Sequence, residues 1–215
     1  MASVLNNVAA LQATRQLNIT SLGMKQTIER LTTGKRINHA SDDATGLANA
    51  NNYNADAKVA HELRKTSYQT YYAEAAKDGY LEEATNQVMR QIELAAGGNG
   101  TSAEFTSVGA LAVAAAAKAG VTITAPTDLS SASTALTTIA TNRGTIAAAM
   151  ATAQSNANLY GIEEENKTAQ MSNIMDADIG AEVVQLTKWQ ILSQAGTSAI
   201  GNANQASQTV LGLLQ

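Results

Sequence analysis

The chain has 215 residues, of which 45% are hydrophobic but only 4% are aromatic, with one proline and no cysteine. So few large apolar side chains argue against a thick globular core or an aromatic-rich β-sandwich, and the lack of cysteine excludes disulfides and cysteine-based metal sites. A formal net charge of −4 argues against nucleic acid as a partner, and no apolar run is long enough to cross a membrane.

Residues 4–31 are predicted to form the first helix, because two apolar stripes follow the 3.6-residue helical turn. One stripe contains Val4, Val8, Leu11, Ile19 and Leu22, and the other contains Leu17, Met24, Ile28 and Leu31. Two stripes predict two buried faces, which is more than a surface helix of a monomer needs. The stretch has no basic region followed by a continuous apolar run, so we expect no secretory signal peptide.

The segment 32–46 interrupts the helical pattern with glycines and turn-forming residues. Ser41, Asp42 and Asp43 are predicted to cap the next helix, because carboxylates there meet unpaired N–H groups and the positive end of the helix dipole. That helix is predicted over about 44–96, before a glycine-rich turn. A shorter alanine-rich helix over 103–119 follows, and residues 121–124 are expected to form at most a very small β element.

The fourth predicted helix carries a heptad repeat that starts at Leu129. Its a positions are Leu129, Leu136, Arg143, Met150, Ala157, Glu164 and Met171, and its d positions are Ala132, Ile139, Ile146, Ala153, Tyr160, Lys167 and Ile174. An apolar stripe kept at this period predicts a coiled-coil seam, with the long second helix as its partner. The glutamates at 163–165 are expected to form a solvated face that interrupts the seam.

The stretch from Val183 to the C-terminus is again predicted to be helical, and Lys188 is its one charged residue. Chain ends are ordinarily polar and frayed. Because both ends here are apolar and poor in charge, they are predicted to be buried by something other than their own monomer. The family resemblance given below makes this a contact of self-assembly, and the residues assigned to it are Val4, Val8, Leu11, Leu186, Trp189, Leu192, Leu211, Leu213 and Leu214.

The sequence offers little for an enzyme, and we expect no catalytic residue, cofactor or metal. His61 and Glu62 begin like a zinc-protease motif, but Lys65 stands where the second histidine is needed. His61 is therefore interpreted as a solvated helical residue. Neither histidine lies next to a plausible nucleophile in the sequence.

Two long motifs carry a resemblance to a known family. Residues 29–50, ERLTTGKRINHASDDATGLANA, and the C-terminal stretch MDADIGAEVVQLTKWQILSQAGTSAIGNANQASQTVLGLL resemble bacterial flagellins. The similarity covers residues 1–98 and about 127–215, so the chain is similar to a short flagellin without the variable outer domains.

The resemblance implies an all-α fold, an elongated antiparallel bundle of long helices whose N- and C-terminal helices pair as a coiled coil lining the filament channel. Residues 1–44 and 176–215 would form that inner layer, and residues 45–175 an outer helical bundle with a short connection at 97–126. The implied function is that of a structural subunit, secreted into the extracellular flagellar filament for swimming motility.

The resemblance also implies partners. These are further copies of the chain, the flagellar type III export channel that passes it unfolded, an export chaperone at the C-terminal helix, the filament cap and the hook-junction proteins. Host innate immune receptors are a further implied class. Arg36, Ile37, Asn38, Asp42, Asp43, Gly46 and Leu47 match the peptide that plant receptors recognise, and Arg90, Glu93 and Leu94 match part of the Toll-like receptor 5 site.

Two alternatives to a filament subunit remain. A hook–filament junction protein would share the same terminal layers, and the short middle favours the filament subunit over it. A membrane-active helical protein would need a lysine- or arginine-rich face, which the polar end helices lack.

Overall fold

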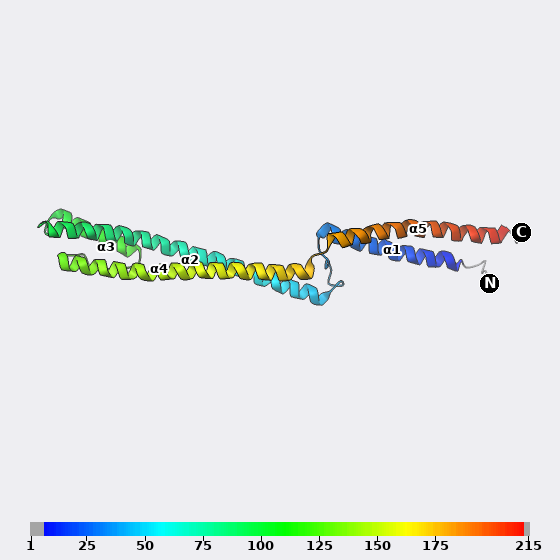
Figure 1. Ribbon diagram of the computed structural model, residues 1–215, viewed down its shortest axis with the longest axis horizontal. Coiled ribbons are helices and arrows are strands. Elements are labelled where there is room, and N and C mark those ends of the chain that lie inside the picture. Colours follow the sequence, from blue (N-terminus) through cyan, green and yellow to red (C-terminus); the bar gives the residue numbers. More distant parts are fainter. Residues whose placement is uncertain (1–6, 213–215) are drawn as a thin grey trace. The chain divides into compact units, whose positions relative to one another are not determined.

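A computed structural model describes residues 7–212, in which every regular element is an α-helix. The helices are α1 (Val8–Thr33), α2 (Ala44–Ala96), α3 (Ala103–Lys118), α4 (Leu129–Met175) and α5 (Ile179–Gly212) (Figure 1). The predicted all-α class is therefore confirmed, and the predicted bounds of the second helix match those of α2. Within residues 7–212 there is no strand, and an isolated antiparallel bridge joins Lys35 to Asp176.

The described residues form two compact units. We call the part up to Asn54 together with the part from Thr168 onward the terminal unit, and Ala55–Lys167 the central unit. The boundaries predicted at 44/45 and 175/176 instead lie close to the turns that follow α1 and precede α5. The predicted boundaries separate an inner layer from an outer helical bundle in an assembly of many chains, so they remain a prediction.

The central unit is built around large apolar side chains shared by α2, α3 and α4. Leu81 and Val88 of α2 and Ile139 of α4 are completely buried. Five positions of the predicted α4 seam are buried, namely Ala132, Ile139, Ile146, Ala153 and Ala157. The seam and its predicted partner helix are thus confirmed over this stretch.

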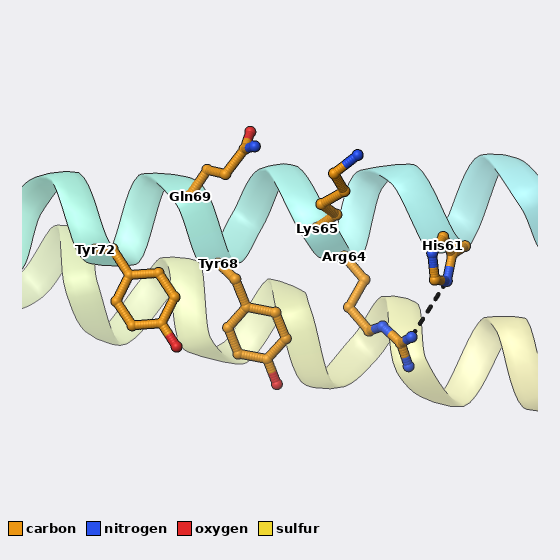
Figure 2. Close-up of a pocket in the computed structure, with 6 residues that line it drawn as sticks. All are labelled: His61, Arg64, Lys65, Tyr68, Gln69 and Tyr72. Carbon is orange, nitrogen blue, oxygen red and sulfur yellow. Dashed lines mark hydrogen bonds between the residues drawn. The ribbon is translucent and has the colours of Figure 1, made fainter.

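Charged residues at seam positions of α4 form ion pairs with residues of α2. The Asp78 carboxylate accepts hydrogen bonds from Arg143 Nε at 2.7 Å and Nη2 at 3.1 Å, and these hold the pKa of Asp78 below its ordinary value. Glu164 lies 3.1 Å from both Arg64 and His61. The interpretation of Glu164 as part of a solvated face was therefore wrong, because its side chain pairs with α2, whereas His61 is exposed on its helix, as interpreted, with Arg64 beside it (Figure 2).

Residues 121–124 form no strand. Gly120 adopts a left-handed conformation with φ of 76°, which turns the chain after α3. Val121 and Ile123 then bury their side chains in the apolar cluster of the central unit. The β-branched residues that suggested a β element serve as core residues of an extended segment.

The terminal unit pairs α1 with α5, which lie side by side (Figure 1). α1 begins at Val8 rather than at residue 4, because the Asn7 side chain accepts a hydrogen bond from the Ala10 amide at 3.0 Å and caps the helix. α1 ends two residues later than predicted, at Thr33, where Gly34 takes the left-handed conformation that commonly ends a helix.

Candidate self-assembly surface

The seam between α1 and α5 is made largely of small and polar residues. Thr20 and Thr27 are the buried residues of α1, and the Thr20 hydroxyl donates a hydrogen bond to the Gln16 carbonyl at 3.0 Å. Buried and half-buried residues recur at alternating three- and four-residue steps, namely Ala10, Ala13, Leu17, Thr20, Met24, Thr27 and Leu31 on α1 and Glu182, Leu186, Trp189, Ser193, Gly196, Ile200 and Ala203 on α5. This is the spacing of a coiled coil, in which small and polar residues alternate with larger apolar ones.

Glycines let the larger side chains of this seam fit. A Cβ atom at Gly23 would lie 2.8 Å from two carbons of the Trp189 ring, so the indole packs directly against the α1 backbone. A Cβ atom at Gly196 would lie 3.4 Å from Leu17 Cδ1. At the other end of the seam, Arg30 and Glu182 form an ion pair at 3.2 Å. Trp189 thus contacts α1 of the same chain, and Leu186 is half-buried.

The apolar stripe of α1 that contains Val8, Leu11, Ile19 and Leu22 is exposed, whereas Leu17, Met24 and Leu31 of the other stripe are half-buried. Leu11 is 72% exposed on α1, and Ile191 is 68% exposed on α5. We call the exposed large apolar residues of these two helices the outward apolar surface, comprising Val8, Leu11, Ile19, Leu22, Ile28, Ile179, Val183, Val184, Ile191 and Leu192. Three residues assigned to self-assembly from the sequence, Val8, Leu11 and Leu192, therefore lie on this surface.

Some residues assigned to self-assembly lie outside what the structure describes. Val4, Leu213 and Leu214 fall outside residues 7–212, and the side chain of Leu211 is likewise not described. For the described residues, the exposure of Val8, Leu11, Ile19 and Leu22 along one face of α1 is the feature that calls for a partner, because a large exposed apolar patch usually marks an interaction site.

The turn between α1 and α2 is tied to the turn between α4 and α5. The Arg36 amide donates to the Met175 carbonyl at 2.6 Å, and the Ala177 amide donates to the Gly34 carbonyl at 2.9 Å. The Arg36 guanidinium also donates to the Ile174 carbonyl at 2.9 Å. These bonds fix the point at which the chain enters α2 and leaves α4.

Two aspartates of this turn have separate roles. Asp43 caps α2 as predicted, since its carboxylate accepts a hydrogen bond from the Gly46 amide at 2.8 Å. Asp42 instead accepts hydrogen bonds from the amides of Asn38 and His39 at 3.1 and 3.0 Å, so its assignment as a helix cap was wrong. Those two bonds lower the pKa of Asp42.

The residues matched to plant receptor recognition are thus built into the turn. Ile37 is only 1% exposed. A Cβ atom at Gly46 would collide with the Asp43 carboxylate and lie 2.8 Å from Ile37 Cδ1. Leu47 and Asn38 are half-buried, whereas Arg36 is exposed.

The second receptor-matched group lies in the central unit, near the end of α2. Arg90 is exposed and pairs with Glu93 at 3.2 Å and with Glu104 of α3 at 2.8 Å. These contacts raise the pKa of Arg90, with the hydrogen bond to Glu104 as the largest cause. Leu94 is buried, so only Arg90 and Glu93 of this group are presented to solvent.

Sequence reasoning missed the residue that joins α3 to α2. Gln91 is completely buried, and its amide nitrogen donates to the Phe105 carbonyl at 3.0 Å. Gly109 of α3 leaves room for this side chain. A polar residue in a helical pattern gives no sign of burial, so the sequence alone offered no signal for it.

Among residues 7–212, no cluster of three or more histidine, aspartate or glutamate side chains is placed to hold a metal ion. None of the helices in that range is long and apolar enough to cross a membrane.

Comparison with known proteins identifies relatives for nearly the whole chain. The family model of the bacterial flagellin N-terminal helical region matches residues 4–107, and that of the bacterial flagellin C-terminal helical region matches residues 129–214. The flagellar filament 30.7 kDa core protein of Treponema maltophilum is 26% identical, over 97% of this chain and 98% of the relative. The 31.3 kDa core protein of the same species is 24% identical, over 98% and 99% respectively. Polar flagellin A of Vibrio parahaemolyticus is 34% identical, over 49% of this chain and 29% of the relative.

Proposed function

Because the chain belongs to the bacterial flagellin family, it is a structural subunit of a flagellar filament, and we propose that it polymerises through the outward apolar surface of α1 and α5. The observation that carries the proposal is the exposure of Leu11, Ile191 and their neighbours on two paired helices. Burying one such side chain stabilises an assembly by roughly 1.5–3 kcal/mol. Several of them, repeated in every subunit, supply a strong drive to assemble.

The same surface explains why α1 and α5 need neighbours. Within one chain their seam contains Ala13, Thr20 and Gly196, which contribute little apolar area. Many large apolar side chains, among them Leu11, Leu22 and Ile191, lie outside that seam. In the filament, α1 and α5 of adjacent copies would bury these side chains against one another, as the terminal helices of a channel-lining layer.

Secretion and export form a further part of the proposal. The mature subunit would lie in the extracellular filament, after passing unfolded through the flagellar type III channel. Two features support this route, since the chain has no cysteine that could form a disulfide and the α1–α5 seam is thin enough to open. An export chaperone would cover the exposed face of α5, where Val184 and Ile191 lie.

The remaining partners follow from position in the filament. Filament cap and hook-junction proteins would contact the same terminal helices at the two filament ends. Recognition by plant receptors would require the turn around Ile37 to open, because that side chain is buried. Recognition by Toll-like receptor 5 would rest on Arg90 and Glu93.

Polymerisation of a double variant tests the proposal. Leu11→Asp combined with Ile191→Asp should leave the monomer helical, because both side chains are exposed within the chain. It should form no filaments, since a buried, unpaired carboxylate is strongly unfavourable. Sedimentation and negative-stain electron microscopy after addition of a polymerising salt measure this.

The control is Leu11→Met with Ile191→Met, which keeps the surface apolar and should polymerise. Filaments of ordinary length from the aspartate variant would contradict the proposal. Discrete rings or caps from the wild-type chain, rather than long tubes, would support a hook–filament junction protein instead.

A further inference from the structure

The turn that joins α2 to α3 contains an asparagine followed by a glycine, Asn99 and Gly100. The Gly98 amide donates to the Ala95 carbonyl at 3.2 Å, and Gly98 has a left-handed φ of 80°. The Asn99 amide donates to the Leu94 carbonyl at 2.9 Å. This pair of hydrogen bonds is a common way to end a helix. It holds Asn99 at a fixed and exposed position directly after α2.

The side chain of Asn99 and the amide that follows it are both unengaged. Within residues 7–212, the Asn99 carboxamide makes no hydrogen bond and the Gly100 amide donates to no acceptor. The carbonyl of the peptide group between these two residues accepts a hydrogen bond from the Ser102 amide at 3.0 Å. Such a bond polarises the peptide group and makes its own N–H more acidic. Gly100 also has no side chain that would shield its nitrogen.

The other asparagines in the described part of the chain lack this combination. Most of them lie inside helices, where the following amide donates to a carbonyl of the preceding turn. Asn7 lies outside a helix, but its side chain is held as the cap of α1. Asn38 also lies outside a helix, but its side chain donates to the Lys35 carbonyl and the following His39 amide donates to Asp42.

We propose that Asn99 is a site of spontaneous modification, in which the Gly100 amide nitrogen attacks the side-chain carbonyl carbon of Asn99. The attacking nitrogen loses its proton to solvent, the new C–N bond closes a succinimide ring, and the side-chain nitrogen leaves as ammonia. Water then opens the ring at either of its carbonyl carbons and yields aspartate or isoaspartate. The reaction consumes only water, so it does not depend on polymerisation.

The product places a negative charge at the end of α2, where nothing offsets it. A carboxylate near the C-terminus of a helix opposes the helix dipole, and the last turn of α2 contains no basic residue. Arg90, one turn earlier, already pairs with Glu93 and Glu104. Isoaspartate also lengthens the main chain between the hydrogen bonds that the Asn99 amide and carbonyl make. Aged copies should therefore differ from new ones in charge and in the geometry of this turn.

Peptide mapping by mass spectrometry, on unpolymerised chain incubated at neutral pH, tests the site. Asn99 should lose its amide about tenfold faster than Asn38, or faster still. Isoaspartyl methyltransferase with labelled S-adenosylmethionine should label the peptide that contains Asn99. This label distinguishes ring formation from direct hydrolysis of the side chain, because direct hydrolysis gives aspartate alone.

The matched control is Gly100→Ala. A Cβ atom at Gly100 would lie 3.7 Å from Ala95 Cα, which is an ordinary contact, so this variant should keep the wild-type circular dichroism. The added methyl group crowds the attacking nitrogen, and conversion of Asn99 should slow by about tenfold.

A second comparison separates the turn from the dipeptide. In guanidinium chloride the chain is unfolded, and helical asparagines such as Asn86 should then convert faster than they do in the folded chain. Asn99 should convert at least as fast in the folded chain as in the unfolded one, because its side chain and the Gly100 amide are already free.

Several results would overturn this modification site. They are equal rates for Asn99 and Asn38 in the folded chain, equal rates for Gly100→Ala and the wild-type chain, and a rate for Asn99 that is much lower folded than unfolded. Aspartate without any isoaspartate would overturn the ring mechanism. Because each measurement uses unpolymerised chain, these results would leave the proposed filament function standing.

Discussion

The terminal and central units are both helical, but they differ in whether their large apolar side chains are buried or exposed. In the central unit, Leu81, Val88 and Ile139 are completely buried. In α1 of the terminal unit, the buried residues are threonines, and Leu11 and Leu22 are exposed. The comparison shows that the central unit has a closed apolar core within one chain, whereas α1 and α5 of the terminal unit leave many of their large apolar side chains exposed, as the proposed assembly through them requires.

The largest expected effect is the collapse of the central unit by a proline. Ile146→Pro removes a backbone hydrogen bond and clashes with the preceding turn, costing ~3 kcal/mol or more before the lost packing is counted. Ile146→Val should cost only about 0.5–1.5 kcal/mol. Chemical denaturation followed by circular dichroism compares them, and equal midpoints would mean that Ile146 does not belong to a packed seam.

A matched pair of alanine substitutions tests the contrast between the units directly. Ile139→Ala should lower the free energy of unfolding of the monomer by about 2–5 kcal/mol, because it leaves a cavity in the core. Leu11→Ala should change it by less than about 0.5 kcal/mol, because Leu11 is exposed. Urea unfolding of unpolymerised protein measures both, and similar losses for the two variants would refute the contrast.

A glycine substitution probes the seam that holds α1 to α5. Gly23→Ala places a methyl group against the Trp189 ring, and such overpacking costs about 1–3 kcal/mol. The chain has one tryptophan, so its fluorescence reports the shift of this ring. Gly201→Ala is the control, since no atom lies within 4 Å of its Cβ position in α5 and it should be neutral or slightly stabilising. An unchanged emission spectrum for Gly23→Ala would show that the indole does not pack there.

The smallest expected effect is the acid sensitivity contributed by the Asp78–Arg143 pair. The pKa of Asp78 is lower in the folded chain than its ordinary value near 3.8, so the ionised carboxylate stabilises the fold. This stabilisation is present above the ordinary pKa and is lost as pH falls through the lower folded-state pKa. Asp78→Asn should therefore lower stability at pH 7 by less than about 1 kcal/mol, because the pair is a third exposed. The difference should vanish at low pH. If Asp78→Asn lowers stability by the same amount at every pH, the charge of the carboxylate does not contribute to stability.

The regular pattern of the central unit made its helices predictable. The heptad repeat identified Ile139 and Ile146 as seam residues, and the glycines after Ala96 marked the end of α2. Glu164 was misjudged because a charge in a heptad looks like an interruption, whereas it forms an ion pair with Arg64 of the partner helix. Such pairing depends on the register between helices, which one sequence does not reveal.

The terminal unit was predicted less well, for a physical reason. The two leucine-rich stripes of α1 were both expected to be buried, but the seam with α5 is centred on Thr20 and Thr27. Hydrophobic periodicity cannot show that a threonine is buried or that a glycine receives the Trp189 ring. What the pattern did indicate correctly is that α1 has more apolar surface than one partner helix covers.

Hydrogen exchange followed by mass spectrometry, on monomer and filament side by side, tests the central claim most directly. If the terminal unit is completed by neighbours, peptides from α1 and α5 should exchange quickly in the monomer while peptides from 55–167 stay protected, and all should be protected in the filament. If α1 and α5 are as slow to exchange in the monomer as in the filament, the terminal unit is complete by itself and the account is contradicted.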